Sequence, residues 1–267
     1  MAKYNKKRVR ELQHDRFRDT TMSFFDRLAN SLEGKGRQIL YGLGGVLVLI
    51  IIITVVVRWN ARKHDEAAQA LGRAITLSTS PVTATPGINT SGVSFTSEKE
   101  RAQRSIDEFE KVAAKYGDPY RTEARYFIAS NRLVIDRPKA IGELNELANS
   151  SQPEVAALAK FALAQTKESD AKYDEAAQMY VALAKLNSAA VSPETANLRL
   201  AKVYDKQGKK KEAVDLLFSI VETARKAKGK DDKPIPSSSA AREAATELQK
   251  LDPARYAQLP PEASILS

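Results

Sequence analysis

The feature that most constrains this chain is an uninterrupted apolar run, residues 39–57, which lies between Arg37 and Arg58 and contains no charged side chain. A helix over this run would rise about 1.5 Å per residue and span roughly 30 Å, the hydrocarbon thickness of a bilayer. A cleaved signal peptide is shorter and ends in a small-residue cleavage site, and a core helix carries a polar stripe. The run therefore predicts an uncleaved transmembrane helix over 38–58.

The two flanks of this run differ in their content of basic residues. Residues 1–37 hold ten lysines and arginines, whereas the other flank has Arg58, Arg62 and Lys63 close in and Arg73 further out. Because the flank richer in these residues stays in the cytoplasm, we expect a cytoplasmic N-terminus. The predicted location is the cytoplasmic (inner) membrane, crossed once, with a periplasmic or other extracytoplasmic C-terminal domain.

The N-terminal tail, residues 1–37, supplies much of the formal net charge of +9, since its ten basic and five acidic residues give +5. Its apolar residues approximate one helical face: Val9, Leu12, Phe17, Phe24, Phe25, Leu28 and Leu32. A basic amphipathic helix beside a spanning segment lies along anionic lipid. Nucleic-acid binding would need interleaved aromatic residues and a reading module, which the tail lacks. We expect lipid contact through 38–58 and the tail, and no nucleic-acid partner.

Residues for chemistry are scarce in this chain. It has no cysteine and two histidines, His14 and His64, neither with a partner at metal-site or triad spacing. Disulfides, thiolate catalysis and thiolate metal sites are therefore excluded. Neighbouring carboxylates such as Glu108 and Glu110 diverge on a helix. The sequence predicts a protein that is not an enzyme, with no catalytic residues, no metal and no cofactor.

From Trp59 onward the pattern predicts helices that come in pairs. Prolines stand at first-turn positions and Ser192 is a suitable N-cap. The stretch Thr79–Thr96 is a loop by composition, and a Lys/Asp/Pro-rich linker covers 226–236. The predicted pairs are 60–78 with 97–116, 119–134 with 137–149, 153–168 with 172–187, and 194–207 with 210–228, followed by a last helix at about 238–250.

A motif recurs in these pairs: a small residue followed, four positions later, by a large one. The four instances are Ser105 with Phe109, Ala140 with Leu144, Ala176 with Tyr180, and Ala213 with Leu217. Their starts are 35, 36 and 37 residues apart. The small residue admits a close neighbouring helix and the large one fills the next groove, which predicts a helical solenoid. We read five tyrosines as core residues of this repeat: Tyr120, Tyr126, Tyr173, Tyr180 and Tyr204.

The clearest unit covers residues 200–213, with Leu200-Ala201, Tyr204, the turn residue Gly208 and the pair Glu212-Ala213. It resembles the tetratricopeptide repeat. The preceding unit keeps the pattern but has Ala171 where that family prefers glycine. The resemblance covers about residues 97–228 and implies an α-solenoid whose concave face, formed by the first helix of each pair, holds polypeptides.

The whole layout resembles the ancillary Sec-translocon subunit family, which implies an inner-membrane protein with a chaperone-associated role. The expected fold is all-α, with one transmembrane helix followed by a solenoid of tetratricopeptide-like pairs. The expected divisions are a basic cytoplasmic tail (1–37), the transmembrane helix (38–58), a juxtamembrane helix and loop (59–96), the repeat domain with its capping helix (97–252) and a loose tail (253–267).

The binding residues expected on the concave face are mixed in charge, which argues against one strongly charged ligand. They are Arg125, Arg132, Phe161, Gln165, Glu168, Lys202 and Lys206. The predicted function is a membrane-anchored module that holds client or partner polypeptides near the translocon or another envelope machine. The alternative is a structural adaptor with one defined partner in a cell-envelope complex.

Overall fold

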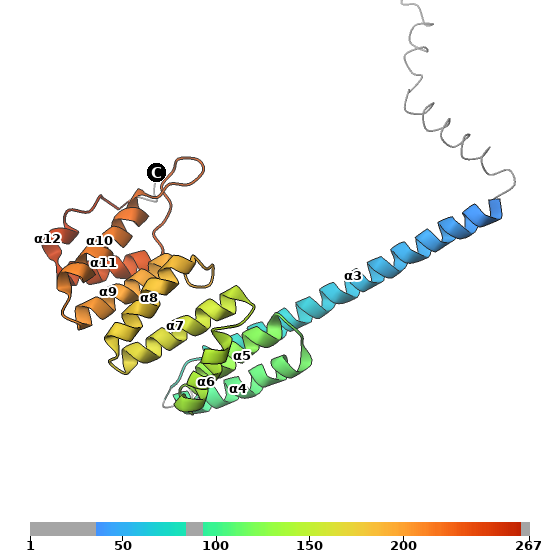
Figure 1. The fold of residues 1–267 in the computed structure, drawn as a ribbon, viewed down its shortest axis with the longest axis horizontal. Helices are drawn as coiled ribbons and strands as arrows, with labels where there is room; N and C mark the ends of the chain where they lie inside the picture. Colours follow the sequence, from blue (N-terminus) through green and yellow to red (C-terminus); the bar gives the residue numbers. More distant parts are fainter. Residues whose placement is uncertain (1–35, 84–92, 263–267) are drawn as a thin grey trace, which may run out of the picture. The chain divides into compact units, whose positions relative to one another are not determined.

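A computed structural model describes residues 36–83 and 93–262, with side chains in the first helix described from Val48 onward. Over these residues the chain is all-α (Figure 1). The helices are α3 (Gly36–Ser78), α4 (Glu98–Lys115), α5 (Tyr120–Arg132), α6 (Arg137–Leu147), α7 (Pro153–Ser169), α8 (Tyr173–Leu186), α9 (Pro193–Lys206), α10 (Lys210–Lys226), α11 (Ser239–Leu251) and α12 (Pro253–Tyr256). The predicted amphipathic tail helix and the middle of the loop after α3 lie outside the described residues.

The chain divides into two compact units, Met1–Asp65 and Glu66–Ser267. In the first unit, the large apolar side chains of α3 between Val48 and Val57 are each 51–61% exposed. The ammonium of Lys63 lies 3.7 Å from the centre of the Trp59 ring. None of the helices, over the described residues, combines the length and apolarity that crossing a membrane requires.

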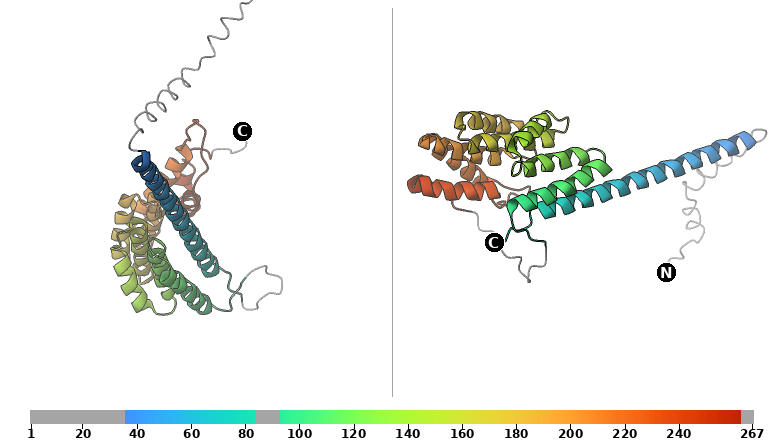
Figure 2. Two further views of the ribbon diagram at one scale, coloured as in Figure 1. Left: turned by 90° about the vertical axis from the view of Figure 1, so that its right-hand side faces the viewer. Right: turned by 90° about the horizontal axis from the view of Figure 1, so that it is seen from below.

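In the second unit, helices that follow one another in sequence pack against one another in space. Contacts link each helix from α4 to α11 with its successor, and further contacts join α5 to α7 and α9 to α11. Figure 2 shows the same succession, green through red, from two further directions. Such neighbour-to-neighbour packing, with few contacts between distant segments, is consistent with an α-solenoid.

The recurring small–large motif forms the centre of this packing. Its eight residues, from Ser105 and Phe109 to Ala213 and Leu217, are each 0–1% exposed. The full burial of both members agrees with the expectation that the small residue admits a close neighbouring helix and the large one fills the next groove. The interpretation of this motif as the buried face of each second helix is confirmed. Of the five tyrosines read as core, Tyr180 is fully buried, and the others are partly buried against the hydrophobic clusters.

The starts of the helices follow local signals. The side chains of Ser97, Asp136, Ser192 and Ser238 each accept a hydrogen bond from the backbone amide three residues on, which satisfies a donor that has no partner within the helix. Proline stands in the first turn of α6, α7 and α9, where its missing N–H costs nothing.

The region after α11 differs from the expected loose tail, and this prediction is corrected over 253–260. Asp252 caps α12 by accepting a hydrogen bond from the Arg255 amide at 2.9 Å. Leu259 is buried in the core cluster of α9, α10 and α11, and Arg225 donates to the Pro260 carbonyl at 2.6 Å. Residues 253–260 therefore pack on the last helices of the stack, where Leu259 is buried among apolar side chains of α9, α10 and α11.

Candidate binding surface of the first helices

We use the name first-helix surface for the side formed by the first helix of each pair together with the capping helix: residues 66–78 of α3, then α5, α7, α9 and α11. Two hollows are lined mainly by these helices. A cavity of about 690 Å³ lies between α3, α5 and α7, and we call it the apolar groove. A cavity of about 330 Å³ lies between α7, α9 and α11, and we call it the charged pocket.

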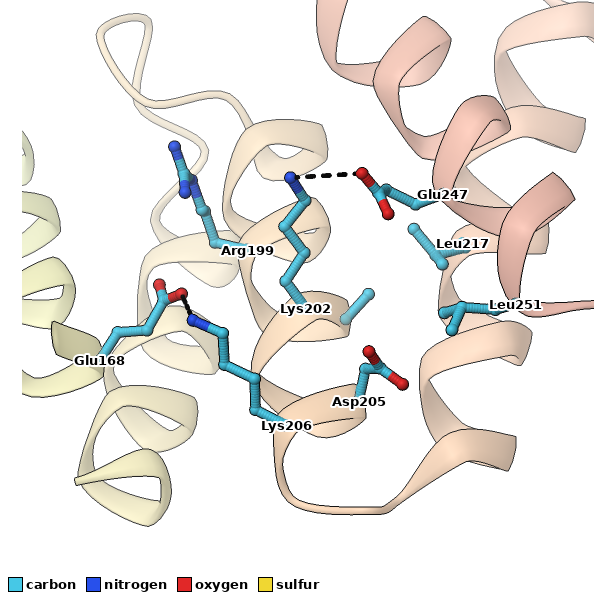
Figure 3. Close-up of a pocket in the computed structure, with 9 residues that line it drawn as sticks. Glu168, Arg199, Lys202, Asp205, Lys206, Leu217, Glu247 and Leu251 are labelled. Carbon is cyan, nitrogen blue, oxygen red and sulfur yellow. Dashed lines mark hydrogen bonds and ion pairs between the residues drawn. The ribbon is translucent and has the colours of Figure 1, made fainter. Parts of the chain in front are cut away.

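The charged pocket is built around Glu168, at the end of α7 (Figure 3). Its carboxylate accepts hydrogen bonds from the Lys206 ammonium at 2.8 Å and from the Tyr180 hydroxyl at 3.1 Å. The Glu168 side chain is only 11% exposed, so water screens this ion pair less than an ordinary surface pair. Burial, followed by the nearby Glu168 charge, raises the pKa of Tyr180 far above its usual range.

Lys202 occupies the other side of this pocket. Its ammonium donates to Glu243 and lies 3.8 Å from Glu247, and both carboxylates belong to α11. The hydrogen bond from Lys202 lowers the pKa of the Glu243 carboxyl below its usual range. Lys202 therefore ties the capping helix to α9.

The remaining charged groups of the pocket are not paired. Arg199 and Asp205, both on α9, make no side-chain hydrogen bond or ion pair within the described residues, and Figure 3 shows them apart from the dashed contacts. The pocket nevertheless contains three cationic and three anionic side chains: Arg199, Lys202, Lys206, Glu168, Asp205 and Glu247. This balance disfavours selection of a ligand by net charge.

The seven binding residues expected from the sequence separate into three groups. Glu168, Lys202 and Lys206 are brought together in the charged pocket. Phe161 and Gln165 lie on α7 outside both hollows, and the Phe161 ring packs edge-to-face on Tyr180 with centroids 5.8 Å apart.

The two arginines of α5 lie elsewhere. Arg125 reaches Glu146 of α6 at 3.2 Å. Arg132 contacts Glu143 of α6 and lies 3.5 Å from Glu110 of α4. Both side chains thus pair with carboxylates of second helices, and their expected contact with a ligand stays a prediction. Arg125 and Arg132 are seven positions apart and therefore share one side of α5. Tyr126, which lines the apolar groove, is rotated by about 100° around the helix axis from Arg125.

The apolar groove was not predicted from the sequence. Its floor consists of Leu71 and Ile75 of α3, Tyr126 and Phe127 of α5, and Val155 and Leu158 of α7. Burial raises the pKa of the Tyr126 hydroxyl. A signal was available, because these apolar residues are spaced three, four or one apart along each helix. Leu71 and Val155 also belong to the hydrophobic core, whereas Tyr126, Phe127 and Leu158 are only partly buried and so contribute apolar surface to the groove.

In comparisons with protein-family models, curated proteins and solved structures, no match to this chain is found. Within the described residues, no group of three or more histidines and carboxylates is arranged to hold a metal ion.

Proposed function

We propose that this protein is a membrane-anchored polypeptide-binding module, whose extracytoplasmic tetratricopeptide-like domain holds client or partner polypeptides close to the translocon or another envelope machine. The observation that carries this proposal is the continuity of α3 from Gly36 to Ser78. One helix contains the apolar run and also supplies Ala67, Leu71 and Ala74 to buried positions of the second unit.

The anchor is supported by the exposure of apolar side chains in α3. The ten positions from Val48 to Val57 are exposed on every side of the helix, and the run continues back to Ile39 in the sequence. Exposed apolar surface of this kind calls for a covering by protein or lipid. Each Leu, Ile or Val at the centre of a spanning helix favours insertion by about 0.3–0.6 kcal/mol.

The binding role is supported by the two hollows of the first-helix surface. Helix-pair domains use such surfaces to hold extended or helical segments. Anchoring a weak binding site to a membrane raises the local concentration of its ligands without any new contact. The proposed effect is therefore retention of polypeptides at the membrane surface.

The anchor and its orientation are tested with single-cysteine variants. Because the natural chain has no cysteine, a thiol reagent can label only the introduced residue. Asn5→Cys marks the tail and Lys230→Cys marks an exposed loop of the second unit. In intact cells a membrane-impermeant thiol reagent should label Lys230→Cys only, and the chain should resist alkaline extraction. Labelling of Asn5→Cys alone would show that the orientation is the reverse of the predicted one. Release of the chain by alkali would contradict a transmembrane anchor.

The binding role is tested by photo-crosslinking in cells. Ser151 is exposed at the apolar groove, and Lys111 is exposed on α4, a second helix. A photoreactive residue at position 151 should capture many exported polypeptides, whereas one at position 111 should capture few. One dominant product from position 151 would instead identify the adaptor role. The absence of products from position 151 would contradict polypeptide binding.

A further inference from the structure

The apolar groove differs from the charged pocket in one respect that bears on its ligand. Three carboxylates line it: Asp118 before α5, Glu123 in the first turn of α5 and Glu154 in the first turn of α7. None of them forms an ion pair within the described residues. No lysine or arginine is among the described residues that line the groove. The groove thus combines an apolar floor with acidic edges.

The hydrogen bonds that these carboxylates accept do not neutralise their negative charge. Asp118 accepts from the Thr122 hydroxyl at 2.6 Å, and Glu154 accepts from Ser188 and from the Ala190 amide at 2.7 Å. These donors are neutral. The N-termini of α5 and α7 contribute about half a positive charge each. Three carboxylates against about one positive charge leave the groove negative.

We propose that the apolar groove binds polypeptide segments in which apolar side chains are accompanied by lysine or arginine. The inference rests on the proposed function and specifies the class of polypeptide. Apolar side chains of the ligand bury against Tyr126, Phe127 and Leu158, and its cations lie beside Glu123, Asp118 and Glu154. Charge complementarity of this kind selects between ligands more than it adds affinity, so acidic segments of equal apolarity are disfavoured.

The test measures binding of short fluorescent peptides to the full-length chain in detergent by anisotropy. One peptide alternates leucine with lysine, a second replaces each lysine by glutamate, and a third keeps lysine but replaces leucine by serine. The first should bind roughly tenfold more tightly than either of the others. Equal binding of the lysine and glutamate peptides would overturn the inference.

Matched charge reversals locate the site. Glu123 makes no side-chain hydrogen bond or ion pair within the described residues, so Glu123→Lys should leave the far-UV circular dichroism unchanged. It should weaken the lysine peptide roughly tenfold. Glu212→Lys makes the same change at an exposed position of α10, and it should have little effect. Equal weakening by both variants would show that net charge alone is measured, which would overturn the inference.

A photoreactive residue at Ser151 supplies the direct readout. It should crosslink the lysine peptide, whereas one at Lys111 should not. A crosslink from position 151 to residues 1–35 of the chain itself, in place of the peptide, would overturn the assignment to a partner. If exported polypeptides are captured in cells but the peptides show no charge preference, the proposed function stands and this inference fails. If no polypeptide is captured from position 151, the proposed function itself fails.

Discussion

The turns within two successive helix pairs have the same geometry but different residues, so backbone strain can be compared between them. Ala171, between α7 and α8, has φ of 57°, and Gly208, between α9 and α10, has φ of 75°. The turns close in the same way, since Lys172 donates its amide to Lys167 and Lys209 donates its amide to Tyr204, each at 2.9 Å. The left-handed conformation is natural for glycine and strained for alanine.

The magnitude of this strain follows from two opposing effects. The left-handed conformation costs an alanine about 1–2 kcal/mol. Glycine loses more backbone entropy on folding, which costs about 0.5–1 kcal/mol relative to alanine. Ala171→Gly should therefore stabilise the protein by about 0.5–1 kcal/mol. A Cβ at Gly208 would meet no atom within 4 Å. Gly208→Ala should therefore destabilise by a similar amount, through the backbone alone.

Chemical unfolding of the full-length chain in mild detergent, followed by far-UV circular dichroism, measures these changes as shifts of the midpoint at constant slope. Gly142→Ala is the matched control, because Gly142 lies in the interior of α6 with open space around its Cα. There the same substitution should stabilise by about 0.8–1 kcal/mol. Shifts of the midpoint in the same direction for Gly208→Ala and Gly142→Ala, or a lower midpoint for Ala171→Gly, would show that backbone conformation does not decide these changes.

Three further changes can be measured by the same unfolding assay. Leu144→Ala removes a fully buried side chain and should cost about 2–5 kcal/mol, and a loss below 1 kcal/mol would contradict its central place in the core. Ser192→Ala removes the cap that accepts from the Thr195 amide at 3.1 Å and should cost about 1 kcal/mol, whereas Ser192→Asp should retain most of the stability. The pKa of Glu243 is lowered chiefly by its hydrogen bond from Lys202, and that of Glu154 chiefly by its hydrogen bond from Ser188. Both carboxylates contribute to the free energy of unfolding at a pH above their unfolded pKa near 4.5, and this contribution is lost as the pH falls through their lower pKa in the folded protein. Acid should therefore destabilise the fold, and Glu243→Gln should reduce the loss of stability in acid.

The helices could be predicted closely because their boundaries depend on neighbouring residues in sequence. Pro153 and Pro193 begin α7 and α9. Ser192 caps α9 by accepting a hydrogen bond from the backbone amide of Thr195, three residues further along the chain. The buried faces also follow from local spacing, since residues four apart share one side of a helix. The predicted pairing of helices needed only the period of the small–large motif.

The candidate site depended on rotations that no local spacing determines. Whether Arg132 faces a ligand or a neighbouring helix is decided by Glu110 and Glu143, which lie on α4 and α6. Lys202 is paired through α11, a helix more than thirty positions away in the chain. The sequence identified the helices that carry Glu168, Lys202 and Lys206, but it did not show that their charges are used within the domain.

The distribution of ion pairs along the first-helix surface distinguishes its two halves. Glu168 and Lys206 join α7 to α9, and Lys202 joins α9 to α11, so these first helices are held to one another by charge. Between α3, α5 and α7 the described residues show no such ion pair. The side-chain Nε2 of Gln152 donates to the Pro119 carbonyl at 3.5 Å, which joins the starts of α5 and α7. A ligand entering the charged pocket would have to displace existing partners, whereas one entering the apolar groove meets carboxylates that no lysine or arginine already neutralises. Three of the seven binding residues expected from the sequence lie in the charged pocket, but their charges are already paired, so we expect polypeptides to be recognised at the groove.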